Sequence, residues 1–507
     1  MTPDEIDFLT TPEARELIER HISGDPARVA LSLRHPHAAL IASQVKYLQR
    51  ARTKLPSYYA ARCIIPPLAF EQSSSEATAA HKAYTGRLCI DLTCGLGVDA
   101  LAFSHRFARV VAIERDPALA AIARHNFARL GAPNIEVICM PAEEFIAKWA
   151  KAGSPVNTAC DTPTGQSHTA TKTPSTGGTD ETDEIISVTG SESCPSKART
   201  GATRGLAESP DRATHATTGS QTDMSVNRSI GTGHVGNERD AGAGYPPAPA
   251  DLIYADPARR GADNARLVLL EECSPDVLAL LPTLRNLAHA VVVKASPLFD
   301  VDEAFRLFGP RTRVEVVSLH GECKEVLIET GPHLAEPRIR VSLPGIGEAE
   351  FARDGRRTST DTGSTTARTT GNAYSSHTVD VPEPNPARYL IVPDVALYKA
   401  RVVDRYFGPE VRLTSTTGYC FANHVPAGLL GKAYPIAEVH PFRPKVLKKL
   451  FRERGIDRLT ILKKDFPLTA AAIAASLGIR EGGTQRAAFT QIGGERLIFL
   501  LEDEETA

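Results

Sequence analysis

A glycine-rich turn after an apolar segment predicts a loop that approaches a bound ligand. The segment Leu88–Leu92 continues through Gly95 and Gly97 toward Asp99. A strand that enters a glycine turn and then a helix points backbone N–H groups at a ligand, and the glycines let the backbone come close to it. Asp91, at the end of the strand, would repel a pyrophosphate but would suit a ligand ammonium group, such as that of a cationic amino-acid sulfonium.

A second carboxylate ends the next apolar segment, where Val110–Ile113 is followed by Glu114. An acid at this position of an α/β sheet can accept hydrogen bonds from two ribose hydroxyls. The same turn also suits a nicotinamide dinucleotide, and it can belong to an unrelated α/β protein with exposed acids. A nicotinamide oxidoreductase therefore stays open as an alternative, although Asp91 and the Asp-Pro loop described next speak against it.

A third carboxylate lies at the end of a later apolar segment. Asp251–Ala255 is followed by Asp256 and Pro257, and the proline would fix the loop at the carboxyl edge of the sheet. Asp256 and the Pro257 carbonyl could accept hydrogen bonds from a substrate amino group and orient its nitrogen in line with a methyl group. We therefore regard these two residues as the candidate catalytic pair.

Cations and a hydroxyl close to the same edge are candidates for substrate binding. Arg259 and Arg260 follow the Asp-Pro loop and could hold phosphates, or they could be solvated surface charges. Lys294 and Ser296 end another apolar segment and would add a cation and a hydroxyl. The alternative for the second pair is an ordinary turn that leads into a helix.

The elements that would position these residues alternate between strands and helices. A helix is predicted from Pro117 to Gly131, and residues 1–80 show mostly helical spacing of apolar residues. Near-continuous apolar strands that alternate with helices indicate a doubly wound, Rossmann-like α/β sheet. The strand candidates are Leu88–Leu92, Val110–Ile113, Ile135–Cys139, Asp251–Ala255, Ala290–Lys294, Val314–Leu319 and Glu325–Ile328.

Two polar stretches interrupt this pattern. Residues 153–244 and about 353–386 are rich in Thr, Ser and Gly with hardly any apolar clusters, so they cannot bury enough surface to offset chain entropy. We expect disordered loop insertions, because the α/β pattern resumes at Asp251; a regulatory segment is the alternative.

The composition limits what kind of partner the whole chain can bind. The 507 residues include 58 Lys and Arg and 60 Asp and Glu, which leaves a formal charge of −2. This excludes a generally basic nucleic-acid binder, so a nucleic-acid surface would have to be a local patch. The nine cysteines are scattered without zinc-ligand spacing, and the sequence shows no signal peptide and no apolar run of membrane-spanning length. We expect a cytoplasmic protein without a metal site or a membrane anchor.

The C-terminal part supplies the densest positive stretch. A helix predicted over Lys445–Arg454 would turn Lys448 and Lys449 outward and Val446 inward, and it could hold an RNA backbone or form a solvated helix face. Around it we predict a small α+β unit. Its other elements are strands Tyr389–Val392, Pro435–Val439 and Leu459–Lys463, helices Val395–Phe407 and Thr469–Leu477, and a hairpin of Ala487–Ile492 with Leu497–Leu501.

Four motifs together resemble one family. DLTCGLGVD, VVAIERD, LIYADPARR and VVVKASP are similar to motifs of the bacterial class I S-adenosylmethionine-dependent methyltransferases that carry a C-terminal THUMP-like domain. The segments 71–79 and 462–496 match that family as well. The resemblance implies a seven-stranded methyltransferase sheet, S-adenosyl-L-methionine as the cofactor, a cytoplasmic enzyme and an RNA substrate, either rRNA or tRNA.

The resemblance also implies roles for single residues. Asp91, Gly95 and Gly97 would cradle the methionine part of the cofactor, and Glu114 would bind its ribose. Further positions assigned to the cofactor side are Gln72, Ser74, Thr93, Asp99 and Glu143.

The sequence departs from the family pattern at three places. Thr93 stands where many methyltransferases have a first glycine, and Pro141 stands where an acid is usual. The adenine contact therefore falls to Glu143, to a backbone amide or to no charged group. The Asp256 motif also lacks the aromatic residue that stacks on flipped bases, and no Pro-Cys pair is present there for cytosine C5 chemistry.

We therefore predict an RNA methyltransferase with four parts. These are a helical region over 1–80, a Rossmann-like methyltransferase domain over 81–330, a small α+β region over 331–430 and a THUMP-like domain over 431–507. The alternatives are a methyltransferase acting on protein or a small molecule, and a non-catalytic RNA-binding protein that keeps the fold.

Overall fold

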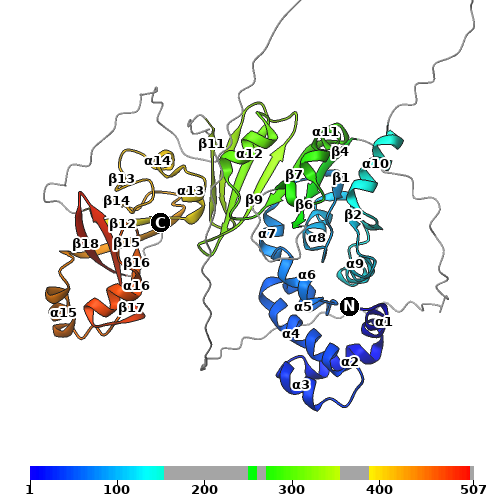
Figure 1. Ribbon diagram of the computed structural model, residues 1–507, viewed down its shortest axis with the longest axis horizontal. Helices are drawn as coiled ribbons and strands as arrows, with labels where there is room; N and C mark the ends of the chain where they lie inside the picture. Colours follow the sequence, from blue (N-terminus) through cyan, green and yellow to red (C-terminus); the bar gives the residue numbers. More distant parts are fainter. Residues whose placement is uncertain (154–248, 260–269, 354–386, 503–507) are drawn as a thin grey trace, which may run out of the picture. The chain divides into compact units, whose positions relative to one another are not determined.

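The computed structural model describes residues 1–153, 249–259, 270–353 and 387–502. The two polar stretches predicted as disordered insertions lie outside these ranges apart from their first residues (Figure 1). Within the described ranges, no helix combines the length and the apolar character that a bilayer crossing requires.

The N-terminal region is helical, as predicted. Threonines and an aspartate cap the first three helices, each of which has proline in its first turn. Ile41, Val45 and Leu48 of the longest helix are at most 1% exposed and form one buried stripe. The helices are α1 (Pro3–Thr10), α2 (Pro12–His21), α3 (Pro26–Ser32), α4 (Ala38–Lys54), α5 (Pro56–Ala60), α6 (Pro67–Gln72) and α7 (Glu76–His81).

A nine-stranded sheet follows, in the order β11-β10-β8-β9-β7-β4-β1-β2-β3. The five strands from β7 to β3 are parallel, and β9 lies antiparallel between β7 and β8. All seven predicted strands are present, and the hairpin of β10 and β11 extends the sheet beyond them. The strands are β1 (Gly86–Asp91), β2 (Phe107–Glu114), β3 (Ile135–Cys139), β4 (Ala250–Ala255), β7 (Ala288–Ala295), β8 (Thr312–Leu319), β9 (Glu322–Thr330), β10 (Arg338–Leu343) and β11 (Gly347–Ala352).

Helices cover both faces of this sheet (Figure 1). Successive residues of β2 alternate between two cores, because side chains of a strand point to opposite faces: Val110 joins one core and Val111 the other. The first core is shared with the N-terminal helices, α8 (Val98–Ser104) and α9 (Pro117–Leu130), and the second with α10 (Ala142–Gly153), α11 (Val277–Leu287) and α12 (Val301–Phe308). This is the predicted doubly wound architecture.

A second sheet contains the C-terminal elements, in the order β13-β14-β12-β15-β18-β17-β16. The predicted strands, basic helix and C-terminal hairpin are all present. The strands are β12 (Tyr389–Pro393), β13 (Arg412–Leu413), β14 (Cys420–Ala422), β15 (Gly431–Pro441), β16 (Arg458–Lys463), β17 (Arg480–Ile492) and β18 (Glu495–Leu501). The two helices that pack within this part are α15 (Pro444–Glu453) and α16 (Ala470–Leu477).

Residues 331–430 differ from the predicted small α+β region in their helices and in how their strands are shared between the sheets. The single helix predicted over Val395–Phe407 is wrong: α13 (Val395–Lys399) and α14 (Val403–Tyr406) are separate, because Arg401 between them has a left-handed φ of 57°. The region is also divided between the two sheets, since its strands β10 and β11 join the first and β12 to β14 join the second.

Candidate active site

A cavity of about 760 Å³ lies at the carboxyl ends of the parallel strands β1, β2, β4 and β7. This edge is where open α/β sheets bind ligands, and the volume falls within the usual range of about 300–1,000 Å³ for small-molecule sites. Most of the predicted site residues line it. They are Gln72, Ser74, Thr93, Gly95, Gly97, Asp99, Glu114, Glu143, Asp256, Pro257, Lys294 and Ser296.

The glycine turn forms one wall of the cavity. Gly95 and Gly97 have φ values of +57° and +87°, which glycine adopts without strain. A Cβ atom on Gly97 would come within 2.8 Å of Phe127 Cε1 on α9 and closer still to its Cζ, whereas a Cβ on Gly95 would meet nothing nearer than 3.8 Å. Gly97 is therefore required by helix packing as well as by the turn itself.

Glu114 is fixed at the cavity wall by backbone donors. Its Oε2 accepts a hydrogen bond from Gly95 N at 2.8 Å, and its Oε1 accepts one from Asp116 N at 2.9 Å. Each carboxylate oxygen has a second lone pair, so both oxygens can still accept hydrogen bonds from ligand hydroxyls. The carboxylate is thus oriented before any ligand binds.

Asp91 lies behind the wall and does not line the cavity itself. Its Oδ1 accepts a hydrogen bond from Thr93 N at 2.9 Å and one from the Thr93 hydroxyl at 3.3 Å. Its Oδ2 is buried and has no hydrogen-bond partner among the described residues. Burial raises the pKa of Asp91 to about 8, because removal from water penalises the charged carboxylate.

Asp256 is held from two sides. Its backbone N–H donates to the Thr93 hydroxyl at 2.7 Å, and its Oδ2 accepts a hydrogen bond from Lys294 Nζ, also at 2.7 Å. Lys294 also donates to Ser74 Oγ at 3.0 Å. Lys294, which the sequence suggested as a substrate-binding cation, therefore forms an ion pair with Asp256 and is not a free charge at the edge of the sheet.

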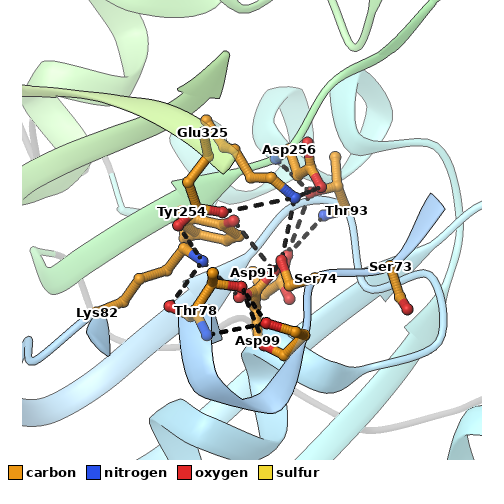
Figure 2. A network of polar contacts seen from close by, with 12 residues as sticks. Ser73, Ser74, Thr78, Lys82, Asp91, Thr93, Asp99, Tyr254, Asp256 and Glu325 are labelled. Atoms are coloured by element: carbon orange, nitrogen blue, oxygen red, sulfur yellow. Dashed lines mark hydrogen bonds and ion pairs between the residues drawn. The ribbon is translucent and has the colours of Figure 1, made fainter. Parts of the chain in front are cut away.

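A buried polar network lies beneath this ion pair (Figure 2). Asp99 accepts hydrogen bonds from Lys82 Nζ at 3.0 Å, Ser74 Oγ at 2.8 Å and Tyr254 Oη at 3.1 Å. Lys82, which is only 1% exposed, also forms an ion pair with Glu325 at 2.8 Å. Asp99, which was predicted to lie on the cofactor side, is therefore also the centre of this buried network.

Sequence reasoning missed Lys82, Tyr254 and Glu325. One signal was present, because Glu325 directly precedes the apolar run Val326–Ile328 of β9, and a buried charge in such a strand needs a partner. Nothing in the sequence identified that partner as Lys82, which precedes β1 and is far from β9 in the chain. Two further cations that were missed, Arg115 and Lys324, line the cavity.

Several apolar residues also line the cavity, among them Leu119, Ala142 and Leu270, and Glu143 at the start of α10 lines it as well.

The remaining candidates lie elsewhere. Arg259 pairs through its backbone with Cys273 in the short ladder of β5 (Ala258–Arg259) and β6 (Cys273–Ser274), while its side chain and the whole of Arg260 fall outside the described residues. Lys448 and Lys449 belong to α15 in the second sheet unit and are not part of the cavity.

The orientation of α15 agrees with the predicted amphipathic helix except at one position. Leu447 and Phe451 are buried, while Lys448 and Lys449 are exposed. Val446 was expected to face inward but is 60% exposed, because the buried face is narrower and includes only Leu447, Leu450 and Phe451.

Comparisons with known proteins agree with this architecture. Residues 431–503 match the family described as THUMP domain-like. A crystal structure from Porphyromonas gingivalis W83, provisionally described as a methyltransferase, is similar over 99% of this chain and 99% of its own, with a TM-score of 0.64 and 19% identity. No curated protein matches the chain in sequence.

Two further structures are similar over about half of the chain. An S-adenosylmethionine-dependent methyltransferase from Agrobacterium tumefaciens covers 51% of this chain and 59% of its own, with 12% identity and a TM-score of 0.25. A Streptococcus mutans protein of the same provisional description as the first, in complex with SAH, covers 52% and 97%, with 8% identity and a TM-score of 0.24.

The strand order and the full-length likeness define the fold as that of a methyltransferase. Residues 431–503 add a THUMP-like domain to it. The chain thus has the two-part architecture that its motifs suggested.

Proposed function

We propose that the protein is an S-adenosyl-L-methionine-dependent methyltransferase that modifies RNA. The observation that carries this proposal is that the Gly95–Gly97 turn, Glu114 and the Asp256–Pro257 loop line the same cavity. These parts come from three different strand ends, and their chemistry suits a cationic nucleoside cofactor on one side and a protic acceptor on the other. When bound, S-adenosyl-L-methionine supplies an electrophilic methyl group.

The residues present fit this cofactor. Asp91 lies directly behind the Gly95–Gly97 turn, and its carboxyl group, when ionised, would favour a ligand ammonium group bound in the adjoining cavity. Glu114 has lone pairs left for ribose hydroxyls, and Glu143 with its apolar neighbours would border the adenine. Gln72 and Ser74 also line the cavity and would contribute to the cofactor side of it.

Asp256 and Pro257 would orient the methyl acceptor. The carboxylate and the Pro257 carbonyl both accept hydrogen bonds, so an acceptor N–H or O–H that donates to them would present its lone pair to the methyl group. A carboxylate in this position can also take up the proton that the acceptor loses after transfer.

The C-terminal unit supports an RNA substrate. Its THUMP-like domain carries the exposed Lys448 and Lys449 on α15, which would neutralise phosphates without reading the sequence. Arg259 follows Pro257 by two residues, and we infer that it could hold a substrate phosphate close to Asp256 and Pro257. We infer a cytoplasmic enzyme on this basis, since rRNA and tRNA are cytoplasmic substrates.

Labelling and ligand screening test the proposal. The protein is incubated with methyl-labelled S-adenosyl-L-methionine and unmodified total RNA, and modified nucleosides are identified by mass spectrometry. Label in RNA that is lost in Asp256→Ala is expected. If label appears only in protein or in small molecules, the substrate is not RNA. RNA binding without methyl transfer would indicate a non-catalytic protein. Thermal stabilisation by NAD(H) or NADP(H) alone would overturn the cofactor assignment.

A further inference from the structure

We propose that Lys294 is a positioning residue, which orients the Asp256 carboxylate toward the methyl acceptor and is itself anchored by Ser74 and the buried network below. This role rests on the proposed function. It differs from direct substrate binding, which the sequence suggested for Lys294.

The first support is that Asp256 is fixed at both its backbone and its side chain. Thr93 accepts the Asp256 N–H bond at 2.7 Å, and Lys294 Nζ holds Oδ2 at 2.7 Å. Among the described residues, no hydrogen bond reaches the other carboxylate oxygen, Oδ1. Asp256 is 32% exposed and lines the cavity, so this second oxygen is the one available to an acceptor N–H or O–H.

The second support is that Lys294 has little freedom to move. Its side chain is 13% exposed, and Nζ donates to both Asp256 and Ser74 while Glu325 Oε2 lies 3.9 Å away. Ser74 in turn donates to Asp99 at 2.8 Å. A side chain held by two hydrogen bonds and bordered by carboxylates can define the position of its partner.

The third support is the charge state of Lys294. Burial alone would lower its pKa, but the carboxylates of Asp256, Asp99 and Glu325 raise it above the usual lysine range. Lys294 therefore stays protonated at neutral pH and cannot take a proton from the acceptor. This leaves orientation of Asp256, rather than proton transfer, as its contribution.

The fourth support is that the acids beside Lys294 belong to a buried network with a second cation. Lys82 is buried and forms ion pairs with Asp99 at 3.0 Å and with Glu325 at 2.8 Å, and Tyr254 supplies a further donor to Asp99 (Figure 2). The acids that border Lys294 are thus themselves held in place by a second cation. A rigid second layer of this kind is what keeps a reacting group within the small tolerance that alignment requires.

The test uses the full-length protein, the RNA identified by labelling, and the variants Lys294→Met, Lys294→Arg and Ser74→Ala. We expect Lys294→Met to lower kcat about 10–100-fold, because a small misplacement of a reacting group costs this much, while the Kd for S-adenosyl-L-methionine changes less than about threefold. Lys294→Arg should restore part of the kcat, and Ser74→Ala should give an intermediate loss. Lys148→Met, which removes a surface lysine paired with Glu144 at 2.6 Å, is the matched control with unchanged kcat.

The outcomes separate the role of Lys294 from the proposed function. Wild-type kcat in Lys294→Met, or an unchanged kcat with a raised KM for RNA, would overturn the positioning role and favour substrate binding. If Lys294→Met fails to fold, Lys294→Arg and Ser74→Ala provide the test. Wild-type kcat in Ser74→Ala combined with no activity in Lys294→Arg would contradict the role of Lys294 as an orienting contact. Absence of methyl transfer by the wild-type protein would instead reject the proposed function.

Discussion

The hydroxyl of Thr93 accepts a hydrogen bond from the backbone N–H of Asp256 at 2.7 Å. The same side chain donates to Asp91 Oδ1 at 3.3 Å, so one threonine links the glycine turn to the Asp-Pro loop. Thr93 stands where many methyltransferases have a glycine, which lacks any side chain to form this link. The threonine therefore has a structural use, which is to hold the Asp256–Pro257 loop against the glycine turn.

Removing the Thr93 hydroxyl should affect transfer more than cofactor binding. We expect Thr93→Ala to lower kcat about tenfold, because one hydrogen bond to the loop is lost at a cost of about 1 kcal/mol or slightly more. Thr93→Ser keeps the hydroxyl and should retain most of the activity. Steady-state kinetics on the two variants check this, and equal activity in Thr93→Ala and the wild type would contradict it.

Binding of the cofactor should release a proton from Asp91. With a pKa of about 8, the Asp91 carboxyl is mostly protonated at pH 6.5, and the positive charge of a ligand ammonium group in the adjoining cavity would favour the ionised form. Calorimetry of S-adenosyl-L-methionine binding at about pH 6.5, in buffers of different ionisation enthalpy, should show release of up to about one proton. Asp91→Asn should abolish this release and weaken binding; an equal release in this variant would show that another group titrates.

The same carboxyl should make the ligand-free protein less stable as pH rises. The folded-state pKa of Asp91 is about 8 and lies above the unfolded value of about 3.9, so its contribution to stability is full below about pH 4 and is lost as pH rises through 8. Relative to Asp91→Asn, the wild-type free energy of unfolding should fall by about 1.4 kcal/mol per pH unit within this window. Urea unfolding at about pH 5 and about pH 7.5 measures it, and a pH-independent difference would reject the raised pKa.

Two glycines with similar backbone angles should respond differently to alanine. Gly131 ends α9 with a φ of +68°, and a methyl group added there would meet nothing within 4 Å. Gly131→Ala should therefore cost only the backbone strain of about 1–2 kcal/mol. Gly97→Ala has the same strain plus overlap with the Phe127 ring, and should cost about 2–5 kcal/mol in all. Thermal and urea unfolding compare the two, and similar losses would mean that Phe127 moves aside easily.

Charge reversal on α15 should weaken RNA binding in a salt-dependent way. The double variant Lys448→Glu, Lys449→Glu should bind RNA at least about tenfold more weakly, and the slope of log K against log salt should decrease by about 0.7 per lost phosphate contact. The double variant Arg20→Glu, Arg28→Glu changes the same net charge at exposed sites in the N-terminal region and serves as the control. Equal losses in both double variants would point to a general charge effect.

The local pattern of the chain determined most of the elements. Val110 and Val111 point to opposite cores because side chains alternate along a strand, and the cap at Asp116 and Pro117 with the left-handed Gly131 sets both ends of α9. Such features depend on neighbours within a few residues, so they can be read without knowledge of the fold. The convergence of the glycine turn and the Asp256 loop was predictable as well, because parallel strands end at one edge of a sheet.

Only the tertiary structure decided which charges are paired. Glu325 meets Lys82 because β9 is inserted antiparallel between β7 and β8, and Lys294 meets Asp256 because β7 lies beside β4. A charge in an apolar strand shows that a partner is needed but does not identify it, since the partner is chosen by strand order over long separations in the chain. The buried Oδ2 of Asp91, without a partner among the described residues, is likewise visible only once the surrounding side chains are in place.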